Sequence, residues 1–222
     1  DGLEPIIDNK SAVDRSVTTS DFPDDAVLEL NGSDQLTLRS DSFIPTFESI
    51  VFASLPSNSL TINLGKSELG GFPVPIADTL LVNAINLGSL DLIINGGEGT
   101  DEVTFAGNVS AGDITVNAEK ITVSAGVTAA SLTLNAEIEE DGEIPLASEY
   151  LGLYVVADSG ALIDLDGATI NVAGAVVLTA TSTFNINATP AEFGDSAFAL
   201  AGLAVIGSAE IRIDSTTLNA AS

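Results

Sequence analysis

A chain of 222 residues with 45% hydrophobic residues is long enough to bury a continuous core. Aromatic residues make up only 5% of the sequence and tryptophan is absent, so the core must consist of Val, Ile, Leu and Ala. The 32 acidic and 6 basic residues leave a formal net charge of -26, which excludes nucleic acid as a partner because phosphate backbones are repelled.

Histidine and cysteine are both absent, so the commonest general base, thiol nucleophiles, disulfides and sulfur metal sites are missing. No local cluster combines carboxylates with basic groups and aromatic rings, and we predict no enzymatic activity. No run of 18 apolar residues occurs, so we expect no membrane insertion. Such an acidic surface is best tolerated where salt or divalent cations screen it, which favours an extracellular or cell-surface location.

The first predicted segment, residues 1–26, is extended, acidic and without periodicity. Such a composition is typical of segments that stay mobile alone. If the segment is ordered, we expect it to be held by the end of its own domain or by a neighbouring subunit.

The second predicted domain, residues 27–222, repeats a short pattern in which an apolar, a polar and another apolar residue follow one another. In a strand this pattern points two side chains inward and one outward. The triplets are centred on Glu29, Thr37, Thr61, Asp91, Thr104, Thr115, Thr122, Thr133, Asp164, Asn171, Asn185 and Arg212.

The spacing of these triplets favours stacked turns. The centres at 104, 115, 122 and 133 return at every second strand after 18 residues, and the later pair 164 and 185 gives 21. A return period near 20 residues is typical of a coil of β-structure. We therefore predict a right-handed parallel β-helix (β-solenoid) of roughly 8 to 10 turns, with an antiparallel β-sandwich as the alternative.

Asparagine followed by alanine often ends a triplet, as in Asn117-Ala118, Asn135-Ala136 and Asn219-Ala220. Asparagine tolerates left-handed backbone, so it is suited to turn the corner between two faces of a coil. Stacked asparagines can also form a hydrogen-bonded ladder, and both interpretations remain open at this point.

Four stretches interrupt the pattern and are predicted to be protruding loops: 41–58, 66–79, 137–152 and 189–203. The most charged, Glu137 to Glu143, is either a solvated loop or a cation-binding loop. Alanine and leucine dominate residues 197–206, which favours a short helix there.

One segment, from Gly96 to Thr104, matches the nonapeptide G-G-x-G-x-D-x-U-x. Its glycines permit left-handed bends, and backbone carbonyls with Asp101 supply the oxygen ligands that calcium prefers. The candidate metal residues are Gly97, Gly99 and Asp101, with Val103 pointing into the core. A turn without metal is the alternative, because the chain holds a single copy.

The nonapeptide and the strands that follow it resemble the RTX repeats and repetitive β-solenoid regions of large secreted bacterial surface proteins and adhesins. The resemblance covers residues 89–136 well and the remainder in style. It implies calcium bound between adjacent nonapeptide turns, each copy supplying half a site.

Six triplets carry threonine at the outward position: Thr37, Thr61, Thr104, Thr115, Thr122 and Thr133. A flat threonine ladder resembles ice-binding proteins, although threonine is also a favoured residue on the solvent face of any strand.

We therefore expect an extracellular structural protein, a self-assembling subunit or module of a filament, sheath, surface layer or adhesin, with a carbohydrate- or ice-binding module as the alternative. The C-terminal strand keeps its inward pattern at Ile211, Ile213 and Leu218, so the last turn is expected to be exposed. Copies of the chain would then join head to tail, with residues 1–26 or the first turn of one copy covering this turn of the next.

Overall fold

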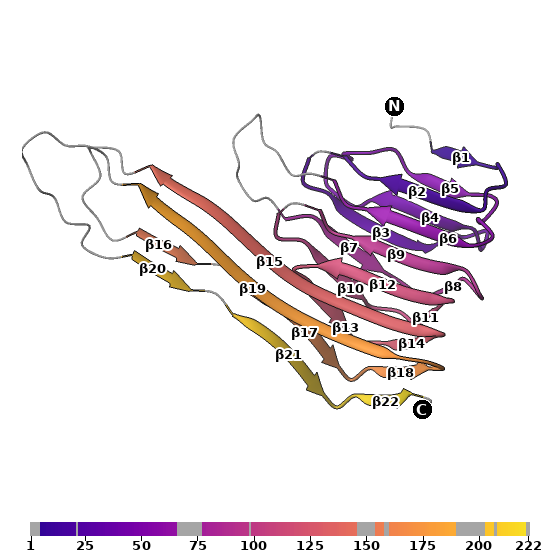
Figure 1. The fold of residues 1–222 in the computed structure, drawn as a ribbon. Coiled ribbons are helices and arrows are strands. Elements are labelled where there is room, and N and C mark those ends of the chain that lie inside the picture. Colours follow the sequence, from indigo (N-terminus) through magenta and orange to yellow (C-terminus); the bar gives the residue numbers. More distant parts are fainter. Residues whose placement is uncertain are drawn as a thin grey trace, which may run out of the picture.

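The computed structural model describes residues 5–20, 22–65, 77–97, 99–145, 154–157, 160–189, 203–206 and 208–220. Every regular element in these ranges is a β-strand, which confirms the predicted all-β fold. The strands form four sheets that are largely parallel and stack along one direction (Figure 1).

The largest sheet has nine strands. In spatial order they are β1 (Ile6–Asp8), β5 (Ile50–Phe52), β4 (Leu36–Ser40), β3 (Asp25–Leu30), β7 (Thr79–Val82), β10 (Glu102–Phe105), β13 (Lys120–Val123), β17 (Ala161–Asp166) and β21 (Ala209–Asp214).

Two further sheets complete the stack. The six-stranded sheet consists of β19 (Val176–Thr189), β15 (Ser131–Pro145), β12 (Asp113–Ala118), β9 (Asp91–Asn95), β6 (Ser59–Asn63) and β2 (Asp14–Thr18). The five-stranded sheet consists of β22 (Thr217–Ala220), β18 (Thr169–Val172), β14 (Gly126–Ala129), β11 (Val109–Ser110) and β8 (Ile85–Asn86). A small two-stranded sheet pairs β16 (Tyr154–Ala157) with β20 (Leu203–Ile206).

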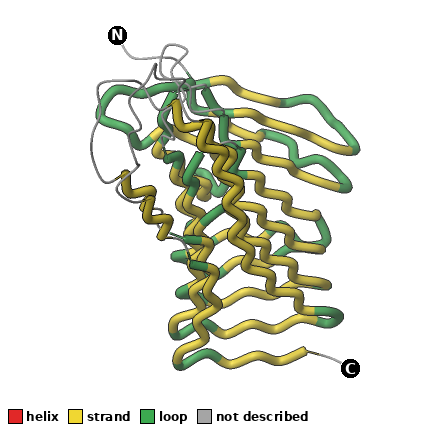
Figure 2. Tube along the Cα trace, turned by 60° about the vertical axis from the view of Figure 1, so that its left-hand side comes forward, coloured by secondary structure: helices red, strands yellow, loops and turns green. Residues whose placement is uncertain are grey.

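From β6 onward the chain visits the six-, nine- and five-stranded sheets in turn and then repeats the circuit, as the layered trace in Figure 2 shows. Thr104 lies beside Thr122, Thr115 beside Thr133, and Val109 beside Val127. The spacing of 18 residues predicted from the triplets is therefore the register of this central stretch, and the arrangement is consistent with a β-helix.

Side-chain alternation builds the core between the three large sheets. Ile114, Val116, Ile121, Leu132 and Leu134 are at most 1% exposed, as predicted. The buried apolar residues form one continuous cluster that runs from Ala26 to Val172. Burying these branched side chains in stacked layers supplies the main stabilisation of the fold.

The chain completes fewer circuits than predicted. Each circuit contributes one strand to the six-stranded sheet and one to the five-stranded sheet. The described residues therefore form five full circuits and part of a sixth, instead of the 8 to 10 turns predicted. The reason lies in the long connections outside the stack. The partners Leu132 and Val176, for instance, are separated by the whole excursion that contains β16.

Two stretches of the N-terminal segment are strands of the main sheets. Strand β1 pairs with β5, and β2 pairs with β6, both in parallel. Arg15 secures this segment, since it donates a 2.7 Å hydrogen bond to the Ser54 carbonyl and forms a 2.8 Å ion pair with Asp8. Of the two ways expected to hold an ordered segment, the end of its own domain is the one seen for residues 6–8 and 14–18, and the domain boundary at residue 26 stays a prediction.

The predicted loop at 137–152 begins inside a long strand. Strands β15 and β19 pair in parallel along their whole length and leave the stack together (Figure 1). The segment Glu137–Glu143 belongs to β15, so the prediction of an acidic loop there is wrong. The predicted loop at 189–203 begins at the last residue of β19, and the paired backbone of β19 gives β15 a neighbour along this stretch.

Other connections depart from the sequence-based expectations in smaller ways. The interruption predicted at 41–58 contains β5, and most of 66–79 lies outside the described residues. Of the helix expected over 197–206, residues 203–206 form strand β20, and residues 197–202 lie outside the described residues. Pairing with β16 explains the extended backbone despite the helix-favouring composition.

Candidate functional site

The nonapeptide turn has the backbone that its glycines predict. Gly97 and Gly99 have φ angles of 124° and 140°, in a region that side-chain-bearing residues rarely adopt. A Cβ atom on Gly97 would lie 2.7 Å from the Gly65 carbonyl oxygen. Val103 is fully buried, as expected for the residue that points into the core.

Asp101 is used differently from a calcium ligand on this turn. Its side chain is fully buried, and its Oδ1 accepts a 2.9 Å hydrogen bond from the backbone N–H of Asp78. Within the described ranges, no group of three or more acidic residues is arranged to hold a metal ion. Asp78 and Glu119 lie next to Asp101, but their carboxylates accept backbone N–H groups, and a calcium ion at Gly97, Gly99 and Asp101 stays a prediction.

Asp101 instead belongs to a column of buried acidic residues that sequence reasoning missed. Asp24, Asp78, Asp101 and Glu119 each precede a strand of the nine-stranded sheet and occupy the same register position. Asp78 Oδ1 accepts the N–H of Asp24 at 2.8 Å, and Glu119 Oε2 accepts the N–H of Asp101 at 2.6 Å. Each carboxylate thereby satisfies a backbone donor that the corner leaves without a strand partner.

Burial raises the pKa of the Asp101 carboxyl from 3.8 to about 7. The hydrogen bond from the Asp78 backbone opposes this effect, and the charges of Glu119 and Asp78 add to it. The column ends after Glu119, because Ala161 and Ala209 take the following register positions. A recurring acid just before each buried strand is the signal from which the column could have been found.

The C-terminal turn is exposed, as its sequence pattern suggests. Ile211, Ile213 and Leu218 are 42%, 53% and 43% exposed. Their partners one level into the stack, Ile163 and Ile170 among them, are fully buried. The apolar side chains of this last described turn are therefore partly open to solvent.

The N-terminal end is covered by its own chain. Strands β3, β4 and β5 form an antiparallel meander within the nine-stranded sheet. Among the described strands, the pairs β3–β4 and β4–β5 are antiparallel, and the other pairs are parallel. Leu36, Leu38 and Phe52 on this meander are at most 3% exposed. The meander therefore closes the core at this end, which accords with the need to cover the end of a stacked β-structure.

Exposed large apolar side chains gather at the two ends of the stack. Among the residues whose side chains are described, they fall between positions 6 and 55 or between 177 and 218. The N-terminal group contains Ile6, Ile7, Val13, Phe22, Leu30, Phe43, Ile44 and Leu55, and the C-terminal group contains Val177, Ile211, Ile213 and Leu218.

The outer face of the six-stranded sheet carries an asparagine ladder. Asn135 donates to Asn117 at 2.9 Å, Asn117 to Asn95 at 2.8 Å, and Asn95 to Asn63 at 2.9 Å. The ladder interpretation is therefore confirmed. The corner interpretation is wrong for Asn117 and Asn135, because both lie within strands, where the outward position of the pleat aligns them.

The threonines do not form one ladder. Thr61, Thr115 and Thr133 lie on the six-stranded sheet, Thr104 and Thr122 lie on the nine-stranded sheet, and Thr37 is only 7% exposed on the meander. Ile93 interrupts the first group, because it stands between Thr61 and Thr115 in register. The flat surface predicted for ice binding is therefore divided between two sheets.

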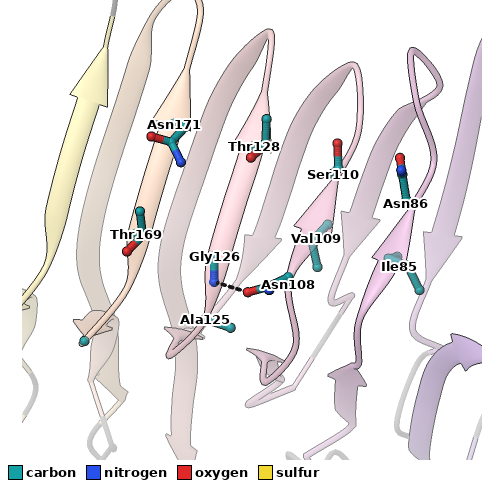
Figure 3. Close-up of a pocket in the computed structure, with 11 residues that line it drawn as sticks. Ile85, Asn86, Asn108, Val109, Ser110, Ala125, Gly126, Thr128, Thr169 and Asn171 are labelled. Atoms are coloured by element: carbon teal, nitrogen blue, oxygen red, sulfur yellow. Dashed lines mark hydrogen bonds between the residues drawn. The ribbon is translucent and has the colours of Figure 1, made fainter.

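A groove of about 710 Å³ lies on the outer face of the five-stranded sheet. Asn86, Ser110, Thr128 and Asn171 stand in one row across β8, β11, β14 and β18 (Figure 3). Asn108 lies beside this row, and its Oδ1 accepts a 2.9 Å hydrogen bond from the Gly126 N–H. The lining residues carry no charged side chain.

No protein-family model matches the chain, and neither the curated proteins nor the solved structures contain a match. Over the described ranges, the structure contains no helix of the length and hydropathy needed to cross a membrane.

Proposed function

We propose that the chain is a self-assembling structural module of the cell exterior, built as a right-handed parallel β-helix (β-solenoid). The observation that carries this proposal is the distribution of exposed large apolar side chains, which occur at the two ends of the stack in the described residues. Scattered exposed apolar residues are common, but two groups at opposite ends favour association through those ends.

The proposed contact joins the open C-terminal turn of one copy to the outer surface of the N-terminal strands of the next. Strands β1 and β2 are edge strands of the nine- and six-stranded sheets, and β21 and β19 are the opposite edges of the same sheets. Such a contact is heterologous, so it continues into a filament unless it closes into a ring. The first strands, rather than a mobile arm, would cover Ile211, Ile213 and Leu218.

Net charge opposes this association. Each copy carries -26, so two copies repel at low ionic strength, and salt or divalent cations are expected to strengthen the contact. We propose that assembly depends on calcium because the cation screens the negative charges of the two copies. The extracellular location rests on the same acidity.

Sedimentation velocity tests the proposal with two variants. The C-end variant is Ile211→Thr with Ile213→Thr, and the N-end variant is Ile7→Thr with Val13→Thr. Each keeps β-branched residues at exposed positions, so the fold should persist while the contact weakens. We expect wild-type protein to form a concentration-dependent series of oligomers in salt, and each variant alone to shift toward monomer.

Mixing the two variants distinguishes a head-to-tail contact from an isologous one. A head-to-tail contact predicts dimers in the mixture, because each variant supplies one intact end, whereas an isologous contact between C-terminal ends predicts that the N-end variant assembles normally. The control is Thr104→Ser with Thr122→Ser on the middle of the nine-stranded sheet, which should assemble like wild type. A wild-type monomer at millimolar concentration in salt and calcium would contradict the proposal.

A further inference from the structure

The outer faces of the six- and five-stranded sheets are both polar, but they use their polar groups differently. On the six-stranded sheet, the amides of Asn95, Asn117 and Asn135 donate to the asparagine of the preceding level. Ser131 likewise donates to Asp113 at 2.7 Å. This face therefore satisfies many of its own hydrogen-bonding groups.

In the groove of the five-stranded sheet, three asparagines have fixed amide oxygens and available amide nitrogens. Oδ1 of Asn108 accepts from Gly126, Oδ1 of Asn86 accepts from the Gly88 N–H at 3.0 Å, and Oδ1 of Asn171 accepts from Asn219 at 2.8 Å. These bonds hold three side chains in one orientation. Because no further bond to the described residues occupies their Nδ2 atoms, each presents oriented N–H donors.

Hydroxyl groups lie between these amides. The hydroxyls of Ser110, Thr128 and Thr169 line the groove, and they make no hydrogen bond to any residue that the structure describes. Ser110 and Thr128 are direct neighbours in register, so their spacing is that of adjacent strands, about 4.8 Å. The groove thus repeats uncharged donors and acceptors at each level of the stack.

Space and charge narrow the class of ligand. Ala125, Gly126 and Gly167 line the groove with little side-chain bulk. The lining carries neither a carboxylate to hold a cation nor a basic group to hold an anion, and a chain of net charge -26 repels anionic polymers. A ligand that accepts and donates many hydrogen bonds, carries no charge and repeats along its length fits these conditions.

We propose that this groove binds a neutral polysaccharide lying along the stack, across β8, β11, β14 and β18. Sugar hydroxyls accept from the oriented amides of Asn86, Asn108 and Asn171 and exchange hydrogen bonds with Ser110 and Thr128. No aromatic ring lines the groove for stacking, so each sugar contributes little and affinity accumulates along the polymer. This site is separate from the apolar ends and does not require assembly.

Affinity gel electrophoresis with dextran, laminarin, hydroxyethyl cellulose or alginate in the gel tests the site. We expect wild-type protein to be retarded by at least one neutral polymer and not by alginate. The groove variant Ser110→Ala with Thr128→Val removes two neighbouring hydroxyls and should weaken that binding roughly tenfold. Circular dichroism checks its fold, and Thr169→Val, on another strand of the groove, provides a second variant with an expected loss of about threefold.

The matched control is Thr115→Val with Thr133→Val, which removes two hydroxyls that are neighbours in register on the six-stranded sheet. It should bind like wild type. Migration unaffected by all three neutral polymers, preference for alginate, or equal weakening in groove and control variants would each overturn the proposal. The C-end assembly variant should retain polysaccharide binding. The binding experiment can therefore be interpreted even if the assembly proposal fails.

Discussion

The two ends of the stack both carry large apolar side chains, but those that face the core are buried at the N-terminal end and exposed at the C-terminal end. Leu38 on the N-terminal meander is fully buried, whereas Ile213 on the last strand of the same sheet is 53% exposed. The difference comes from strand direction, because the chain reverses twice at β4 and β5 and so covers its own core. Whether the apolar core is covered at an end of the stack therefore depends more on antiparallel strands that fold back over that end than on local composition.

The largest expected effect concerns pH, because the acidic column runs through the N-terminal levels and stops at Ala161. The folded pKa of Asp101, about 7, lies above its unfolded value of 3.8, so the folded state binds more protons between these values. The contribution of Asp101 to stability is therefore fully present below about pH 4, is lost as pH rises to about 7, and stays absent above it. The Asp101 contribution is about 4 kcal/mol at most.

Urea unfolding from pH 4 to 8 in calcium-free buffer measures this effect. Asp101→Asn keeps an acceptor for the Asp78 N–H but cannot ionise, so it should remove the loss of stability that Asp101 causes between pH 4 and 7 and be more stable than wild type at pH 8. Asp113→Asn, an exposed change of the same kind, serves as the control. Equal slopes for wild type and Asp101→Asn would show that the column is not the titrating group.

Truncating apolar side chains at the two ends sharpens the contrast in packing. Leu38→Ala should cost about 3 kcal/mol of unfolding free energy, because it leaves a cavity in a closed core. Ile213→Ala should cost less than about 1 kcal/mol in the monomer, since half of the side chain already contacts solvent. Similar losses at both ends would mean that the C-terminal turn is covered in solution.

Two arginines, one at each end of the stack, allow polar contacts at the two ends to be compared. The Arg15 side chain is 8% exposed and bonds both Ser54 and Asp8, so Arg15→Met should cost about 2 kcal/mol. Arg212 on the open end pairs with Glu210 at 2.7 Å but is largely exposed, and Arg212→Met should leave the unfolding midpoint unchanged. Hydrogen exchange should localise the first loss to β1 and β2.

The parallel register of the central levels was predictable because three-residue alternation and an 18-residue return are local signals in the sequence. Thr104, Thr115, Thr122 and Thr133 occupy the expected neighbouring positions for that reason. The spacing changes outside this stretch, where connections of different length intervene. Counting levels from a constant period therefore gave too many.

The acidic column and the groove were harder to predict, since each combines residues from different circuits. Asp24 and Asp78 are neighbours only because β3 and β7 pair across a long connection. Asn86 and Ser110 in the groove are neighbours because β8 and β11 pair across one full circuit of the chain. The calcium hypothesis considered Asp101 within its own turn, whereas its hydrogen-bond partners, Asp78 and Glu119, come from the two neighbouring levels.

The paired projection of β15 and β19 constrains how the molecule can change over evolutionary time. Each residue from Leu132 to Pro145 has a partner between Val176 and Thr189. Inserting or deleting one residue in either strand would shift every later pair by one and turn its side chains to the opposite face. Length changes are therefore tolerated only when both strands change together, and the two segments should be inherited as a unit of matched size.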